Sequence, residues 1–381
     1  MARAYLDHAS SSPLRPTALA AMLPYLSDHP GDPGRLHHEG RVTRVAVESA
    51  REQVAAAFGA RPREVVFTAT GTEAVNAAIW GAVARARADA PDRRPHVVTS
   101  AVEHSAVLES CRRAPVDLTV VGVDDRGRLD ADEVAAAITE RTALVSVHLA
   151  NHEVGTVQTA VPAITAAARS AGAVVHLDAC AAAGHLPIDF AGLDADLCSL
   201  TGHPWGAPKG AAALLVRRGL RFPPFVVGGA QERARRAGAE NVAAVVGFGA
   251  AAAELSGTLA AETAAALALT DALAAAATAV PGVVRHGDPD HRLANLVCLG
   301  IDGVEAEPVL LGLDQHGVAV HSGSSCSSEL LEPSPVLAAM GVDAERSLRA
   351  SVGWCSTADD VATFAAAFPG VVARLRDLRT A

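Results

Sequence analysis

Lysine is almost absent from this 381-residue chain, because Lys209 is the single lysine in it. A reaction that needs the primary amine of a lysine side chain therefore has one candidate. Aromatic residues make up only 3% of the chain, so the hydrophobic core must be built mainly from Ala, Val and Leu. Half of the residues are hydrophobic and 19% are charged, which is enough apolar surface for a large core.

Other features are missing as well. The six cysteines form no CxxC pair with metal spacing, so no metal site is predicted. The most apolar stretches, 246–253 and 260–277, are interrupted or bounded by polar residues, and we interpret them as buried helices. The N-terminus has no apolar signal segment, which favours a cytoplasmic location without membrane contact. The net charge of -10 argues against a nucleic-acid surface.

Short β-branched runs alternate with Ala-rich segments of helical length through the first two thirds of the chain. The predicted strands are 64–68, 96–99, 118–121, 143–147, 173–177 and 212–216. The helical segments include 74–87, 131–139 and 163–171. This alternation predicts an α/β fold in which helices cover both faces of a mostly parallel sheet. Ligands of such sheets bind at the carboxyl ends of the strands.

The pattern changes after about residue 250. A long Ala-rich helical stretch, 246–279, is followed by apolar runs at 295–299 and 318–321, which predicts a smaller α+β unit. We therefore expect a large domain over 15–250 and a small domain over 251–381 that includes residues 1–14. Concentrations of Pro, Gly and Ser at 28–34 and 321–335 predict loops.

Two segments of possible chemical importance come directly after predicted strands. Thr68–Ala74 opens a predicted helix, and it forms either a cradle for a phosphate group or a simple helix N-cap. His104 follows the next strand, and it either stacks on a planar ring and moves protons or is an ordinary structural histidine.

Two further strands end in polar residues. Asp178 ends an apolar strand, where it either pairs with a protonated pyridine nitrogen or caps the following turn. The segment 199–210 is a polar turn rich in Gly and Pro, and it is either a site or a plain connection.

The C-terminal third adds two candidates. Cys326 lies in the Ser- and Gly-rich segment 321–328, where a thiol is a candidate nucleophile or sulfur carrier. Arg349 is either an ordinary arginine or one that binds a carboxylate with both ends of its guanidinium group.

Taken together in this order, these segments resemble the cysteine desulfurases of the class V aminotransferase group. The resemblance runs from Tyr5 to about Asp359 and is closest to the bacterial branch with a long cysteine loop. It implies fold type I, with a large domain built on a seven-stranded type of sheet. It also implies a cytoplasmic homodimer that binds pyridoxal phosphate (PLP) and takes sulfur from L-cysteine or a related amino acid. The sulfur would pass through an enzyme persulfide to an acceptor protein.

The resemblance assigns roles to individual residues. Gly71, Thr72, Thr201 and His203 match residues at the PLP phosphate, and Asp178 matches the partner of the pyridine nitrogen. His104 matches the histidine that stacks on the ring and moves protons. Cys326 matches the persulfide cysteine. Arg349 matches the arginine for the substrate carboxylate, and Asn151 is a second substrate-binding candidate.

The departures from the family gather around the cofactor. Pro204 stands where the family has the lysine that forms a Schiff base with PLP, and proline has no side-chain amine. In the same comparison, His152 replaces a family Asn and Ala181 a family Gln, both beside the phenolic oxygen of PLP. Ala239 replaces a Thr that family members offer to the partner subunit's phosphate, and Asp32 replaces an Asn of an early loop. Lys209 matches a different family lysine, one that does not bind PLP, so it is a poor substitute.

Three hypotheses follow from this combination. The first is a cysteine desulfurase that uses Lys209 or holds PLP without a covalent bond. The second is a sulfur-relay or binding protein without PLP, in which Cys326 accepts a persulfide from another donor. The third is a degenerate subunit that pairs with an active paralogue, as a pseudoenzyme.

Overall fold

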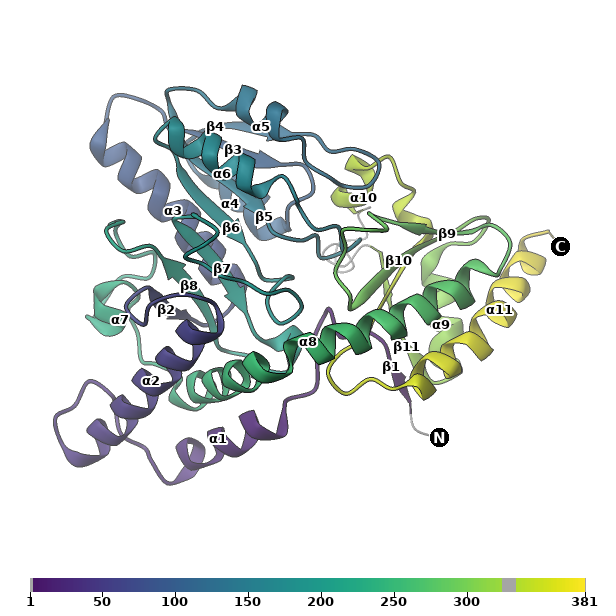
Figure 1. Cartoon of the computed structure of the whole chain (residues 1–381), viewed down its shortest axis with the longest axis horizontal. Coiled ribbons are helices and arrows are strands. Elements are labelled where there is room, and N and C mark those ends of the chain that lie inside the picture. Colours follow the sequence, from purple (N-terminus) through teal and green to yellow (C-terminus); the bar gives the residue numbers. More distant parts are fainter. Residues whose placement is uncertain (1–2, 324–333, 381) are drawn as a thin grey trace.

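The protein is described here from a computed structural model, over residues 3–323 and 334–380. Its centre is a seven-stranded sheet in which only β8 runs antiparallel to its neighbours (Figure 1). From one edge to the other the strands are β2 (Val65–Thr68), β8 (Ala212–Val216), β7 (Leu197–Thr201), β6 (Val174–Asp178), β5 (Thr142–His148), β3 (His96–Ser100) and β4 (Asp117–Val121). The predicted α/β class with a mostly parallel sheet is confirmed.

Helices cover both faces of this sheet because successive strand residues point to opposite sides. Val97 packs under α3 (Gly71–Asp89) and α4 (Ser105–Arg113). Val98, its neighbour in the chain, belongs to the cluster on the other face. The helices of that face are α2 (His38–Ala57), α6 (Val161–Ser170) and the first half of α8 (Val242–Thr278), and α5 (Ala131–Ala137) lies beside α6.

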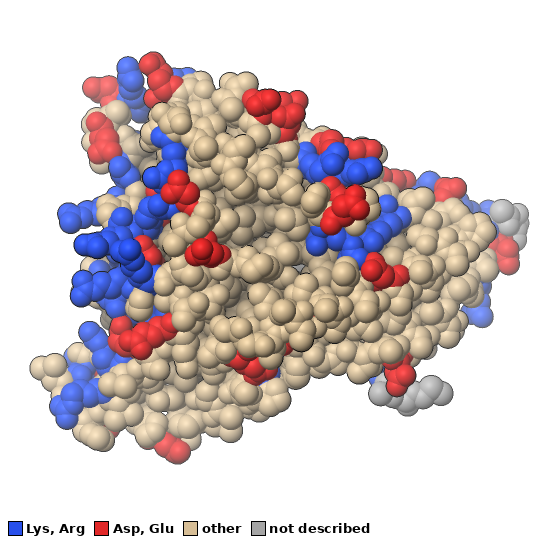
Figure 2. All heavy atoms as spheres, in the orientation of Figure 1, with Lys and Arg blue, Asp and Glu red and all other residues tan. Residues whose placement is uncertain are grey.

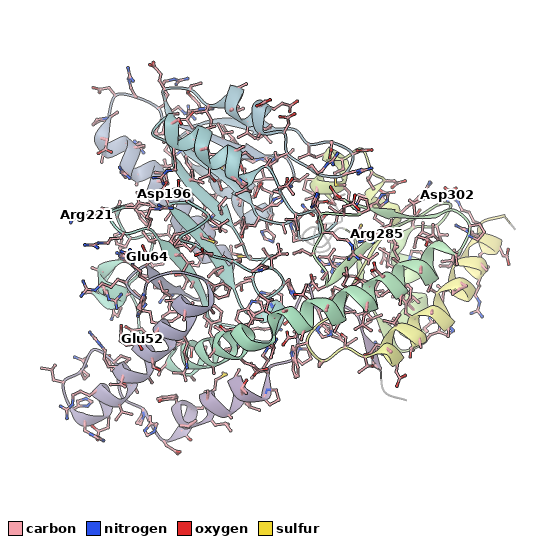
Figure 3. All side chains as sticks on the ribbon, in the orientation of Figure 1. Glu52, Glu64, Asp196, Arg221, Arg285 and Asp302 are labelled. Atoms are coloured by element: carbon pink, nitrogen blue, oxygen red, sulfur yellow. The ribbon has the colours of Figure 1, made fainter. Side chains whose placement is uncertain are left out.

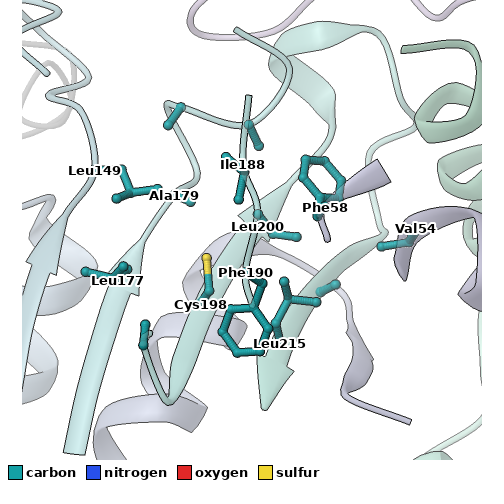
Figure 4. Close-up of a cluster of buried hydrophobic side chains, with 14 of the residues drawn as sticks. Val54, Phe58, Leu149, Leu177, Ala179, Ile188, Phe190, Cys198, Leu200 and Leu215 are labelled. Carbon is teal, nitrogen blue, oxygen red and sulfur yellow. The ribbon is translucent and has the colours of Figure 1, made fainter. Parts of the chain in front are cut away.

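The larger core is formed by aliphatic side chains with a few aromatic rings among them. Figure 4 shows part of it, where Leu177, Cys198 and Leu200 of neighbouring strands meet Phe58 and Phe190. All five side chains are buried. Most of the other members of this core are Ala, Val and Leu, as the composition led us to expect.

A second, smaller unit follows in the chain. Its antiparallel sheet has the order β12 (His321–Ser322), β13 (Ser347–Ser351), β10 (Leu296–Ile301) and β9 (Val283–His286). The N-terminal strand β1 (Ala4–Tyr5) pairs in parallel with β11 (Val318–Ala319), so the N-terminus returns to this unit. The remaining elements are α1 (Pro16–Ser27), α7 (Gln231–Ala234), α9 (Ala306–Gln315), α10 (Pro335–Ala339) and α11 (Ala358–Thr380).

Helix α8 connects the two units, as Figure 1 shows. Phe248 in its first half packs in the core of the large sheet, and Leu273 in its second half packs in the core of the small unit. Residue 250, the boundary we expected, therefore lies inside this helix. By length and composition α8 would suffice to cross a membrane, but half of its most apolar window is buried inside the protein.

Charge is unevenly distributed over the surface. On the face in Figure 2, basic side chains gather along the edge that carries β2, β8 and α7. Figure 3 labels Arg221 and Glu64 at this edge, whereas Arg285 and Asp302 lie in the smaller unit.

Several sequence predictions need correction. β7 was given no bounds among the predicted strands: 199–210 was interpreted as a turn between two apolar strands, although Ser199–Thr201 complete the first of them. The single strand expected at 318–321 is divided between β11 and β12. The prediction also missed β9 and β13, of which β13 carries Arg349.

The α8 interpretation predicts a large difference between two substitutions in the same helix. Phe248→Ala should lower the free energy of unfolding by about 3–5 kcal/mol, because Phe248 is fully buried. Leu267→Ala should change it by less than about 0.5 kcal/mol, because Leu267 is 41% exposed. Urea unfolding of both variants tests this, and equal effects would contradict the packing described for α8.

Candidate functional site

A cavity of about 250 Å³ opens where the carboxyl ends of the strands meet the start of α3. Its lining combines six residues that the sequence singled out with a further set of polar and small side chains. The six are Gly71, Thr72, His104, Asp178, Thr201 and His203. The others include Thr70, His148, Ala150, His152, Cys180 and Ala181. Within residues 3–323 and 334–380, no three His, Cys, Asp or Glu side chains are grouped as metal ligands.

The parallel register explains why these residues meet. His148, the last residue of β5, is the direct partner of Asp178, the last residue of β6. Asp178 in turn pairs with Ser199, two residues before Thr201 ends β7. Since parallel strands end at the same edge of a sheet, their terminal side chains share one cavity.

The start of α3 supplies one end of the cavity. Thr70 is the N-cap of this helix and accepts a hydrogen bond from the backbone N–H of Glu73. A Cβ on Gly71 would lie only 2.7 Å from the Sγ atom of Cys180, so a larger residue would not fit here. The N-cap alternative is therefore confirmed for Thr70, and Gly71 and Thr72 line the cavity at the positive end of the helix dipole.

Two polar atoms at this end have no hydrogen-bond partner among the described residues. They are Oγ1 of Thr201 and Nδ1 of His203, both buried. Burial, together with the charge of Lys209, lowers the pKa of His203, so its ring stays neutral. Unpaired buried donors are costly, and an anion bound at the helix start would give them partners.

Asp178 is 6% exposed, and its Oδ1 accepts a hydrogen bond of 2.9 Å from the N–H of Cys180. Asp178 therefore caps the following turn, and because it also lines the cavity it remains available to pair with a pyridine nitrogen there. Burial, with the nearby Asp178 charge, raises the pKa of Cys180 well above its usual value, so this thiol stays protonated.

His104 is the N-cap of α4, and its Nδ1 accepts a hydrogen bond of 3.0 Å from the N–H of Ala106. The neutral ring therefore carries its proton on Nε2. The ring lies edge-on to that of His152, with 5.0 Å between the ring centroids. Two imidazoles thus share one wall of the cavity.

The sequence analysis missed His148. Its Nδ1 lies 3.1 Å from Oε1 of the buried Glu103, an ion-pair distance whose angle is not that of a hydrogen bond. Its Nε2 lies 3.2 Å from the amide nitrogen of Gln158. The missed signal was its position, because the predicted strand 143–147 stopped one residue before the actual end of β5.

Arg349 and Asn151 do not line the cavity. The guanidinium of Arg349 donates to the carbonyl of His152 and to the Ser10 hydroxyl, and it lies 3.2 Å from Oδ1 of Asp7. The side chain of Asn151 accepts hydrogen bonds from two backbone N–H groups and donates to the carbonyl of Val102. The structure therefore gives Asn151 a role in holding its loop, and does not place it in the cavity as we predicted.

Neither lysine candidate position provides an amine in the cavity. Pro204 is buried in a short 3-10 turn, His203–Trp205, where its carbonyl accepts a hydrogen bond from Ser12. Lys209 is exposed and is not part of the cavity lining. The predicted persulfide residue, Cys326, lies outside the described residues.

Comparison with known proteins agrees with this architecture. The model of the family described as "Aminotransferase class-V" matches residues 4–364. "Cysteine desulfurase IscS" of Methanosarcina thermophila is 38% identical over 380 residues, which cover 98% of this chain and 93% of that protein. "Cysteine desulfurase" of Cereibacter sphaeroides is 41% identical over 387 residues, which cover 99% and 98% of the two chains.

Solved structures show the same likeness. A "NIFS-LIKE PROTEIN" superposes with a TM-score of 0.88 at 26% identity, and the match covers 99% of each chain. A structure titled "SspA in complex with cysteine" has a TM-score of 0.77 at 28% identity, covering 91% of this chain and 98% of that one. The chain therefore belongs to the class-V aminotransferase family and, within it, to the cysteine desulfurases.

Proposed function

We propose that this protein mobilises sulfur from L-cysteine with PLP that it holds reversibly, without a covalent bond. The observation that carries the proposal is a cavity that keeps the anion-binding end and Asp178 while Pro204 replaces the anchoring lysine. When bound, PLP supplies an aldehyde that captures the amino group and a ring that accepts electrons from the amino acid.

The residues present fit the two ends of PLP. Its phosphate would give partners to two buried atoms, Oγ1 of Thr201 and Nδ1 of His203, beside the start of α3. The carboxylate of Asp178 would pair with the ring nitrogen when that nitrogen is protonated. The covalent attachment does not fit, because Pro204 lacks an amine and Lys209 is exposed outside the cavity lining.

The substrate side of the proposal depends on two residues. Arg349 would hold the carboxylate of the amino acid, and its buried Nε has no hydrogen-bond partner among the described residues. Its present contacts with Asp7 and Ser10 would then have to be rearranged. Cys326 would receive the sulfur as a persulfide and pass it to an acceptor protein, as the family resemblance suggests.

A sulfur-relay protein without PLP is the second candidate, and the loss of several cofactor contacts favours it. Pro204 and Ala181 lack the groups that would hold the aldehyde side of PLP, and Ala239 lacks the hydroxyl a family member would offer to its dimer partner. Equilibrium dialysis with PLP separates the two candidates, since a relay protein of this kind would bind none.

Removing the unpaired hydroxyl of Thr201 should have opposite effects on the stability of the ligand-free protein and on its affinity for PLP. Thr201→Val should stabilise the ligand-free protein by about 1 kcal/mol, because it removes a buried group without a partner. The same change should weaken PLP binding about tenfold, because one bond to the phosphate is lost. Thermal unfolding and equilibrium dialysis measure the two effects.

Thr165 offers a matched control, because its Oγ1 is also buried without a partner among the described residues but lies on α6, outside the cavity lining. Thr165→Val should stabilise the protein similarly and leave PLP binding unchanged. Equal binding losses in both variants, or none in Thr201→Val, would contradict the assignment of the phosphate end.

Restoring the missing amine gives the second prediction. After incubation with PLP and desalting, Pro204→Lys should keep the absorption band of an imine between PLP and lysine. Borohydride should then attach the PLP group permanently to the protein. The wild type and Pro204→Arg, which adds a cation but no primary amine, should lose the band. If borohydride attaches PLP to the wild type, the non-covalent proposal is overturned.

Cys326→Ser tests the sulfur-carrying role. Loaded with PLP and given L-cysteine, this variant should form no protein persulfide, whereas Cys355→Ser should form it as the wild type does. Cys355 is the matched control because it is the exposed cysteine of the described residues. Unchanged persulfide formation in Cys326→Ser would contradict the assignment of Cys326 as the sulfur carrier.

A further inference from the structure

His104 and His152 share one wall of the cavity but differ in their capacity to take up a proton. The Nδ1 atom of His104 already accepts a hydrogen bond from the N–H of Ala106. A second proton on the ring would have to displace this bond. It would also place a positive charge at the N-terminus of α4, where the helix dipole disfavours cations. In the neutral His104 ring, Nε2 is therefore the nitrogen that carries the proton and can donate a hydrogen bond.

His152 has the opposite environment. Its Nε2 lies 3.6 Å from Oε1 of Glu153, whose side chain is 1% exposed. Burial alone would raise the pKa of Glu153, but His152, Ser334 and Arg349 outweigh it and lower that pKa below its usual value. The carboxylate is therefore charged, and it stabilises a positive charge on the neighbouring imidazole.

Further charged groups surround His152. Arg349 donates to the His152 carbonyl and opposes a second positive charge, but Asp7 lies 3.2 Å from the same guanidinium and offsets it. Asp178 lines the same cavity and favours a cation. Two further polar groups among the described residues are uncharged: burial lowers the pKa of His203, which lines the cavity, and it raises the pKa of Cys298 beside Glu153 to about 12.

We propose that His152, with Glu153 as its counter-charge, is the proton acceptor of this cavity and takes a proton from the ammonium group of the bound amino acid. The proposal rests on the proposed function, since that function places an amino acid here. An N–H bond of the ammonium breaks, its electron pair stays on the nitrogen, and the proton forms an N–H bond on the imidazole.

The missing lysine makes this step necessary. An amino acid enters as an ammonium ion, which has no lone pair and cannot react with an aldehyde. In the absence of a lysine amine, the cavity needs another base close to neutral pH, and an imidazole paired with a carboxylate meets that need. The asparagine that the family resemblance places at this position could not accept a proton. His152 therefore supplies a base in a cavity where Pro204 has removed the lysine amine.

The direct test is the nitrogen NMR spectrum of the protein labelled with ¹⁵N-histidine, without PLP. As the pH falls, the His152 ring should gain its second proton before the His104 ring does. Glu153→Gln should move the midpoint for His152 to lower pH by about one unit. His152→Gln identifies the signal, and the exposed His316 at the end of α9 should not move.

The second test follows the absorbance of PLP in the loaded protein after L-alanine is added, over a range of pH. L-alanine is the probe because L-cysteine reacts with free PLP in solution. His152→Asn should react about a hundredfold more slowly near neutral pH, with its pH profile displaced upward. His316→Gln, remote from the cavity, should match the wild type.

The outcomes are separable. If the wild type takes up no PLP, the proposed function fails, and the NMR titration alone decides the role of His152. The inference is overturned if His104 is protonated first, or if Glu153→Gln leaves the His152 titration unchanged. It is also overturned if His152→Asn reacts with L-alanine at the wild-type rate. Should Glu153→Gln fail to fold, Ser334→Ala removes the hydroxyl that donates to the same carboxylate, so Glu153 depends more on His152. The His152 midpoint should then move to higher pH, and an unchanged or lower midpoint would overturn the inference.

Discussion

The alignment of β5, β6 and β7 is the constraint on which the site depends. Their parallel pairing brings His148, Asp178 and Thr201 to one edge of the sheet, and the start of α3 meets the same edge. None of these side chains needs a long loop to reach the cavity, because strand termini position them directly. The cavity can therefore persist although the covalent anchor of the cofactor is absent.

The loss of the anchor changes what the remaining contacts must do. In a cavity with a lysine, a covalent bond supplies much of the retention, and hydrogen bonds orient the ring. Here the helix start, Thr201, His203 and Asp178 would have to supply both retention and orientation. On the proposed function, the changes at Pro204, Ala181 and His152 would affect the handling of the aldehyde and its protons. Thr201 and His203 would still offer buried polar atoms to the phosphate.

Much of the fold could be predicted from the sequence because β-branched runs mark six of the seven strands of the large sheet. β7 escaped because Leu197–Thr201 contains one β-branched residue and its polar end resembles a turn. The cavity residues Thr72, His104 and Asp178 could be predicted because they follow strands. The sequence could not show that Nδ1 of His104 is occupied, because that depends on a hydrogen bond from the backbone N–H of Ala106.

Long-range contacts could not be predicted from the sequence either. The guanidinium of Arg349 reaches the carbonyl of His152, 197 positions away in the chain, and no local pattern marks that pairing. The same holds for Ser334, whose hydroxyl donates to the carboxylate of Glu153. These contacts decide the charge around the cavity, so the difference between the two histidines emerges only when the chain is folded.

The central claim is that the cavity binds PLP reversibly and without a covalent bond. The most direct measurement treats the PLP-saturated wild type with borohydride, removes unbound PLP and determines the mass of the intact protein, with equilibrium dialysis of an untreated sample alongside. The account predicts saturable binding in dialysis and no increase in the mass of the reduced protein. A mass increase by one PLP group that maps to Lys209, or an absence of binding, would contradict it.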